Sequence, residues 1–243
     1  MRALLIGRGR MGAMLAELLE AGGHSVLARL DQDDIGRLSS LPKADVAIDF
    51  SAPGALEPVC GYVRRTGTPL VCGVTGYGEG DMEALRALGA FAPVLYSANY
   101  SLGVAVFKRL LEVLGDTPLA DWDVEITETH HNRKADAPSG TAKLLLAALD
   151  PAHSLRPVYG REGLCGPRQK GEVGMHALRG GTVAGEHTVA FFGEDEAFEL
   201  THKAASRRVF AAGALEAAQR LAGREKGFYT LEQIVFGGNP CSR

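Results

Sequence analysis

The chain has 243 residues and a formal net charge of −3, with 46% hydrophobic and 23% charged residues. That composition is typical of a water-soluble globular protein of one large or two small domains, and the charge excludes a general attraction to nucleic acid or to an anionic membrane. The longest wholly apolar run, Leu144–Leu149, is far below the ~18 residues of a membrane span, so we expect a cytoplasmic protein that binds neither.

The first predicted element is a short apolar strand, Arg2–Ile6, which runs directly into a G-x-G-x-x-G motif. A helical segment, Ala13–Ala21, follows the motif. A strand, a glycine turn and a helix in this order are typical of a dinucleotide-binding unit, because the glycines let the backbone turn tightly and approach a pyrophosphate. The residues of the motif, all candidates for cofactor binding, are Gly7, Arg8, Gly9, Arg10, Met11 and Gly12.

The second predicted strand, Ser25–Leu30, ends at Asp31. An acidic residue about 20 residues beyond the glycines is placed to accept hydrogen bonds from an adenosine ribose. The sequence therefore predicts that Asp31 binds the ribose of the cofactor.

Three further strands, Ala44–Phe50, Pro69–Val74 and Pro93–Ser97, alternate with helices over Gly54–Thr66 and Asp81–Phe91. Strands separated by helices of this length predict a parallel, doubly wound α/β sheet of the Rossmann type. Ligands of such sheets bind at the carboxyl ends of the strands. The residues at these ends are Phe50, Gly73, Val74, Thr75, Ser97, Ala98, Asn99 and Tyr100.

After Ser101 the pattern changes to an amphipathic helix, Leu102–Leu114, and an alternating strand, Trp122–Glu128, which delivers His130 to its end. Two histidines, an arginine and a lysine then occupy five positions, His130 to Lys134. The turn that follows opens into the apolar run Ala142–Leu149, and Ser or Thr before such a run caps a helix whose N-terminus binds anions. The combination suits a small, doubly negative substrate with a proton donor beside it.

The segments Val173–Arg179, Thr182–Phe192 and Ala197–His202 read as strands joined by glycine-containing turns, and we interpret them as an antiparallel meander. A final alanine-rich helix covers Ser206–Leu221. A meander after an α/β half predicts a second, α+β domain with a mostly antiparallel open sheet.

With these residues in view the chain resembles the 4-hydroxy-tetrahydrodipicolinate reductase (dihydrodipicolinate reductase) family of lysine and diaminopimelate biosynthesis. The stretch Glu128–Thr141 is similar to the family signature E-x-x-H-H-x-x-K-x-D-A-P-S-G-T, and supporting matches are Asp49-Phe50-Ser51, Gly185-Glu186-His187-Thr188 and Thr201–Arg207. The resemblance implies a dinucleotide-binding domain of residues 1–101 and 211–243. It also implies a substrate-binding and oligomerisation domain of residues 102–210, which would assemble a homotetramer.

The resemblance implies NADH or NADPH as hydride source and a cyclic imine dicarboxylate as substrate. Lys134 is the expected proton donor and His130 a second acid/base candidate, and the residues leave the division of proton transfer between them open. His131, Ser139, Gly140 and Thr141 are expected to hold the substrate carboxylates. Asp31 would bind the ribose, and the strand ends at 73–75 and 97–100 would flank the nicotinamide. Gln32 stands where the family often has an arginine, which weakens the expectation of a preference for NADPH.

Two other functions stay open at this point: another Rossmann dehydrogenase of aspartate-derived metabolites, and a regulatory protein that senses NAD(H) without turnover. A semialdehyde dehydrogenase needs a nucleophilic cysteine at a helix start, and none of Cys60, Cys72, Cys165 and Cys241 has that context. These cysteines show no metal-like spacing, and adjacent histidines on a strand point to opposite faces. We therefore expect no metal.

Overall fold

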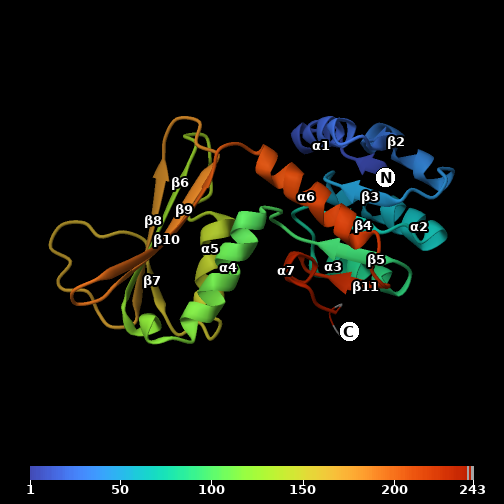
Figure 1. Cartoon of the computed structure of the whole chain (residues 1–243). Helices are drawn as coiled ribbons and strands as arrows, with labels where there is room; N and C mark the ends of the chain where they lie inside the picture. The colour runs from blue at the N-terminus through green and yellow to red at the C-terminus, as the bar shows by residue number, and fades with distance from the viewer. Residues whose placement is uncertain (240, 242–243) are drawn as a thin grey trace. The chain divides into compact units, whose positions relative to one another are not determined.

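The computed structural model describes residues 1–239 and 241, and the chain divides into two compact units (Figure 1). The first unit is formed by Met1–Leu102 together with the C-terminal segment that begins at Arg208, and the second by Gly103–Arg207. The sequence had placed these junctions at 101/102 and 210/211. Within the described chain, no helix combines the length and apolar character that crossing a membrane requires.

The first unit is built on a six-stranded sheet with the order β11-β5-β4-β3-β1-β2. All five strand pairings are parallel. The chain places β2 on one side of β1 and β3 on the other, so the order reverses between β1 and β3, where open α/β sheets bind ligands. The strands are β1 (Arg2–Ile6), β2 (Ser25–Leu30), β3 (Val46–Asp49), β4 (Leu70–Cys72), β5 (Pro93–Tyr96) and β11 (Gly227–Tyr229).

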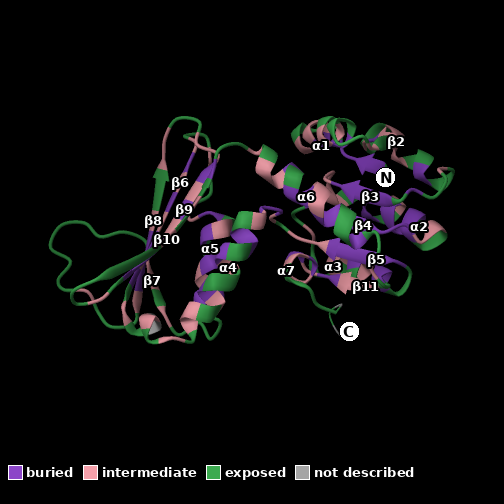
Figure 2. Ribbon diagram, viewed as in Figure 1, coloured by how far each residue is buried: buried purple, intermediate pink, exposed green. Residues whose placement is uncertain are grey.

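Helices cover both faces of this sheet, and the strands between them are buried (Figure 2). One face packs against α2 and α3 in an apolar core that includes Val59, Val63 and Leu85. The helix α6 is rich in small residues, and a Cβ at Gly213 would stand 1.8 Å from the Tyr100 carbonyl oxygen, so glycine there lets α6 lie directly on the segment that follows β5. The helices are α1 (Arg10–Ala21), α2 (Leu56–Thr66), α3 (Glu79–Ala87), α6 (Arg208–Leu221) and α7 (Leu231–Phe236), with 3-10 turns at Gln32–Ser39, Pro53–Ala55 and Leu88–Ala90.

The second unit is an open five-stranded sheet with the order β10-β9-β6-β8-β7, and α4 and α5 pack on one of its faces (Figure 1). Its core joins Phe107 and Leu111 of α4 and Leu145 of α5 to Ile126 and Phe191 of the sheet. The elements are α4 (Leu102–Gly115), a 3-10 turn at Pro118–Asp121, β6 (Asp123–His130), α5 (Gly140–Leu149), β7 (Arg156–Val158), β8 (Glu172–Arg179), β9 (Gly185–Phe192) and β10 (Ala197–Ala204).

The predicted fold class, a doubly wound parallel sheet plus an α+β unit with an open sheet, is confirmed. Of the predicted meander, the antiparallel pairing of β9 with β10 is confirmed, but the pairing of its first two strands is wrong. The strands β8 and β9 do not pair, because β6 lies between them, parallel to β8 and antiparallel to β9. Their connection instead passes across the carboxyl end of β6, where Gly180 N–H donates to the His130 carbonyl and His131 N–H to the Val183 carbonyl. The second sheet is therefore mixed, with two antiparallel and two parallel pairings, and not mostly antiparallel as predicted. Residues after β8 enclose the end of the strand that carries His130.

Candidate active site

The glycine motif adopts the geometry that a dinucleotide loop needs. Gly7 has a φ of 103°, in the region that favours glycine, and its N–H donates to the Leu30 carbonyl at 2.8 Å. A Cβ at Gly12 would lie 2.0 Å from the Gly7 carbonyl oxygen, so only glycine lets α1 approach β1 this closely. A Cβ at Gly9, by contrast, would meet nothing within 4 Å, so open space lies over the start of α1. The loop thus fits a pyrophosphate at a helix N-terminus.

Asp31 lies at the end of β2 and presents an ionised carboxylate beside this loop. Its oxygens accept hydrogen bonds from the backbone N–H of Arg8 and of Gln32, each at 2.9 Å. These bonds, the Arg8 one first, lower the pKa of Asp31 below its ordinary value. The guanidinium of Arg8 pairs with Asp34 at 2.6 Å. A carboxylate has about four acceptor positions, so Asp31 retains capacity for two ribose hydroxyls.

The residues at the strand ends that we expect near the nicotinamide pack against one another. A Cβ at Gly73 would lie 2.2 Å from the Phe50 ring, so glycine makes room for that ring, which packs edge-on against Tyr100 at 5.4 Å between centroids. The Tyr100 hydroxyl donates to the Cys72 carbonyl at 2.8 Å, and the side chain is 1% exposed. Val74 is equally buried. Because these two side chains are buried, the cofactor contacts predicted for Tyr100 and Val74 would be made by their backbone. Thr75 and Ala98, by contrast, are exposed.

In the second unit, β6, the following loop and α5 bring the predicted substrate residues together. Of the predicted cap residues, Ser or Thr before the apolar run, Ser139 is the N-cap of α5: its hydroxyl accepts from Ala142 N–H at 3.1 Å. The same hydroxyl bonds His187 Nε2 at 3.0 Å, and Ser139 is 2% exposed. Its hydroxyl is therefore hydrogen-bonded inside the protein. The backbone N–H groups of exposed Gly140 and half-buried Thr141 are better placed than this hydroxyl to bind the predicted anion.

The loop between β6 and α5 carries the predicted proton donor. Lys134 Nζ pairs with the exposed carboxylate of Asp136 at 2.7 Å. Half-buried His131 bonds Arg207 through Nε2 at 3.2 Å, and burial, followed by the charge of Arg207, lowers the pKa of His131. A shallow hollow lined by Asn132, Arg133, Gly181 and Thr182 lies beside the loop.

Sequence reasoning gave no role to Glu128, His187 and Arg207, which contact predicted residues, or to Arg179, which binds Glu128. Glu128 lies two residues before His130 on one strand, and residues i and i+2 share a face, so that spacing was a usable signal. The ring of His187 packs edge-on against His130 at 5.2 Å, and burial lowers the pKa of His187 to about 4. Arg179 reaches Glu128 only through the pairing of β6 with β8, for which the sequence offered no signal.

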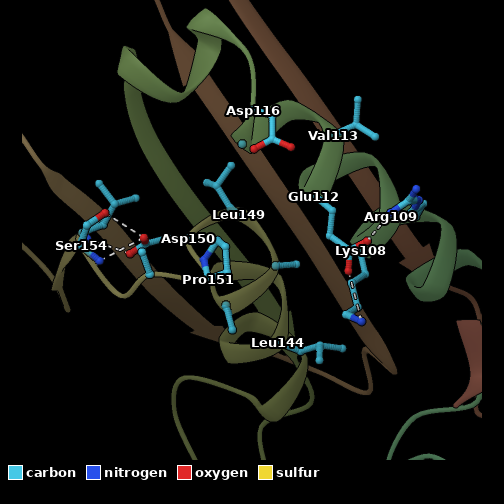
Figure 3. Close-up of a pocket in the computed structure, with 15 residues that line it drawn as sticks. Lys108, Arg109, Glu112, Val113, Asp116, Leu144, Leu149, Asp150, Pro151 and Ser154 are labelled. Atoms are coloured by element: carbon cyan, nitrogen blue, oxygen red, sulfur yellow. Dashed lines mark hydrogen bonds and ion pairs between the residues drawn. The ribbon is translucent and has the colours of Figure 1, made fainter. Parts of the chain in front are cut away.

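A larger groove of about 860 Å³ lies elsewhere on the second unit, between the C-terminal ends of α4 and α5 (Figure 3). Four of its charged groups have partners: Lys108 and Arg109 both contact Glu112, and Asp150 accepts from Ser154. No predicted site residue lines it. Among residues 1–239 and 241, no group of three or more His, Cys, Asp or Glu side chains is arranged to hold a metal ion.

Comparison with known proteins assigns both units to one family. The family model "Dihydrodipicolinate reductase, N-terminus" matches residues 1–100, and "Dihydrodipicolinate reductase, C-terminus" matches residues 103–235. A solved structure of dipicolinate-bound dihydrodipicolinate reductase from Paenisporosarcina sp. TG-14 has the same fold, with a TM-score of 0.74 at 23% identity over 96% of this chain and 98% of that one.

Curated relatives named 4-hydroxy-tetrahydrodipicolinate reductase match over nearly the full length. The enzyme of Exiguobacterium sibiricum is 40% identical over 96% of both chains. That of Staphylococcus haemolyticus is 41% identical over 96% of this chain and 100% of the relative. The chain therefore belongs to the 4-hydroxy-tetrahydrodipicolinate reductases, the NAD(P)H-dependent oxidoreductases of lysine and diaminopimelate biosynthesis.

Proposed function

We propose that this chain reduces 4-hydroxy-tetrahydrodipicolinate to tetrahydrodipicolinate, with NADH or NADPH as hydride source. The observation that carries the proposal is the β6–α5 loop, which holds Lys134 and His131 between His130 at the end of a strand and the N-terminus of a helix. Cations and a helix N-terminus together suit a substrate with two carboxylates.

We assign the nucleotide to the first unit and the dicarboxylate to the second. Gly7, Gly9 and Gly12 would hold the pyrophosphate and Asp31 the ribose, because the loop is open at Gly9 and the Asp31 carboxylate keeps unused acceptor positions. A bound cofactor would supply the hydride. The protein's own work is to orient the substrate and to deliver a proton.

Lys134 is the proposed proton donor and His130 a second acid/base group. Lys134 Nζ donates to a carboxylate, Asp136. Ion pairs to an exposed partner contribute only about 0–1 kcal/mol, so a substrate carboxylate can replace Asp136 at little cost. His131 and the backbone of Gly140 and Thr141 are proposed to hold the substrate carboxylates, and Ser139 to shape the helix end that presents them.

Two further assignments complete the proposal. We place the enzyme in the cytoplasm, which suits four unpaired cysteines. We also propose a homotetramer built on the second sheet. The face opposite α4 and α5 carries Leu178 and Phe192, which are 50% and 44% exposed, as expected of an association surface. Light scattering after size exclusion tests it, and a monomer at micromolar concentration would contradict it.

The test of function is loss of NADH or NADPH absorbance on addition of the cyclic imine dicarboxylate. Lys134→Ala should lose turnover, and Lys170→Ala, an exposed lysine of the same unit, serves as the matched control and should keep it. Binding of NADH without consumption in the presence of the imine would refute the enzyme and favour a sensing protein. Turnover of a linear semialdehyde instead would favour another dehydrogenase.

A further inference from the structure

Glu128 is a buried carboxylate whose acceptor positions are all occupied. It lies on the helix-covered face of β6 with His130 and is 1% exposed. One oxygen accepts from His130 Nδ1 at 2.5 Å and from Arg179 at 2.9 Å, and the other accepts from Ser139 N–H at 3.0 Å and from Arg179 at 2.9 Å. Four donors fill the four positions that a carboxylate offers.

Arg179 keeps this carboxylate ionised. It stands opposite His130 in the parallel pairing of β8 with β6 and binds Glu128 through both terminal nitrogens. Burial alone would raise the pKa of Glu128, but the hydrogen bonds from Arg179, His130 and Ser139 outweigh burial and lower it. Because an arginine stays charged at any working pH, the pair is a permanent carboxylate–guanidinium unit.

An ionised carboxylate can only accept, so the bond to Glu128 requires the proton on Nδ1 of neutral His130. The other ring nitrogen, Nε2, then carries a lone pair. A Cβ at Gly185, the first residue of β9, would lie 3.0 Å from Nε2 and crowd it, so glycine at this position keeps that edge of the ring clear. Among the described residues no hydrogen bond to Nε2 is formed, and this nitrogen is able to take or return a proton.

The same pair fastens the loop that carries Lys134. Arg179 donates to the Asp136 carbonyl at 2.6 Å, and Glu128 accepts from Ser139 N–H. These two contacts hold the loop just after Lys134 and again where α5 begins.

We propose that Glu128 and Arg179 are positioning residues of the reductase: they fix His130 as the Nδ1–H tautomer, with Nε2 available for proton exchange, and they anchor the Lys134 loop. This inference rests on the proposed function, because it assigns His130 to proton transfer. It distinguishes two roles, since Glu128 sets the tautomer while Arg179 mainly holds Glu128 and the loop.

Glu128→Gln tests the proposal with a matched control on the same strand. A glutamine keeps one acceptor oxygen and replaces the other with an NH2 group that donates. The backbone N–H of Ser139 cannot move its proton whereas His130 can, so the amide oxygen should face Ser139 and the NH2 group His130, which favours the opposite tautomer of His130. We expect kcat to fall about 10²–10⁴-fold, with KM and NADH affinity within a few-fold of wild type. The control is Glu125→Gln. Glu125 bonds His176 at 2.6 Å and two arginines, Arg161 and Arg168, but its side chain lies on the opposite face of the sheet, so we expect it to keep wild-type kcat.

Long-range nitrogen–proton NMR correlations of isotope-labelled histidine give a readout that does not need turnover. Wild-type His130 should show Nδ1–H and the Glu128→Gln variant Nε2–H. Arg179→Lys, which keeps the charge but loses the two-pronged contact, should retain Nδ1–H and raise KM more than it lowers kcat. It also serves if Glu128→Gln does not fold.

Three results would overturn the proposal: an Nε2–H tautomer in the wild type, unchanged kcat in Glu128→Gln, or equal losses in Glu128→Gln and Glu125→Gln, which would indicate a structural role only. An inactive wild type would instead refute the proposed function, while the tautomer measurement would still report on Glu128.

Discussion

The Asp31 carboxylate should give this enzyme a modest preference for NADH, and Asp31→Ala should narrow or reverse it. The carboxylate is held ionised by two backbone N–H groups. It can accept from both ribose hydroxyls of NADH, whereas the 2′-phosphate of NADPH would bring a second negative group to the same place.

The size of the effect depends on which cations offset that repulsion. The guanidinium of Arg8 is engaged by Asp34 at 2.6 Å and by the Arg29 carbonyl at 3.1 Å, and Gln32 carries no charge. Two unit charges about 5 Å apart repel by about 3 kcal/mol at an effective dielectric near 20, and surface exposure and salt reduce this to about 1–2 kcal/mol. Since about 1.4 kcal/mol is ten-fold, we expect roughly a ten-fold preference in kcat/KM.

The assay is kcat/KM for both cofactors at fixed ionic strength, in wild type, Asp31→Ala and Asp33→Ala. Asp33 is an exposed carboxylate two positions away and controls for net charge. A ten-fold or greater wild-type preference for NADPH would refute the reasoning, because an arginine would then govern the pocket. Equal effects of the two substitutions would show that charge alone, not contact, sets the selectivity.

Four further outcomes are expected. Lys134→Ala should lower kcat about 10²–10⁴-fold and leave the affinity for NADH, measured by fluorescence titration, nearly intact. A variant that keeps more than about a tenth of the wild-type kcat would contradict the assignment of Lys134 as proton donor. Ser139→Ala removes the cap of α5 and the partner of His187, so it should lower the free energy of unfolding, measured in urea, by about 1 kcal/mol. The same variant should raise KM more than it lowers kcat, and a large loss of kcat at constant KM would instead show a chemical role for Ser139. Asp49 is fully buried with one oxygen unpartnered, and burial raises its pKa to about 6 from 3.8, so the free energy of unfolding should fall as pH rises between these values. Asp49→Asn should flatten that slope and raise the free energy of unfolding at pH 8 by about 2–3 kcal/mol, and an unchanged pH profile of stability in the variant would contradict a raised pKa at Asp49. Chelator treatment should leave activity intact, and a loss restored by zinc would mean that a metal site was missed.

The sequence predicted the first sheet well because its strands are continuous apolar runs separated by helices. It missed β11, since Gly227–Tyr229 has only three residues and no alternation to detect. In the second sheet it predicted the pairing of β9 with β10 but failed on β8 and β9, because a glycine turn between two strands normally indicates a hairpin. Here the connection straddles β6, and only long-range pairing specifies that arrangement.

The candidate site also contains features that the sequence predicted and features that it could not predict. The glycine loop, Asp31 and the cap at Ser139 are local patterns and could be read directly. The burial of the Tyr100 ring could not, because it depends on carbonyl groups of β4 and β5. The partners of Glu128 likewise come from three separate segments, so their charge and hydrogen-bond balance exists only in the folded chain.

The edge position of β11 has a consequence for synthesis and folding. Until residues 227–229 leave the ribosome, β5 is itself the edge of the first sheet, and its backbone groups that pair with β11 in the folded chain have no partner. An uncovered apolar edge can recruit a strand from another chain. Nascent or C-terminally clipped chains should therefore aggregate through β5 and depend on chaperones, and proteolysis after α6 should harm solubility more than its small loss of mass suggests.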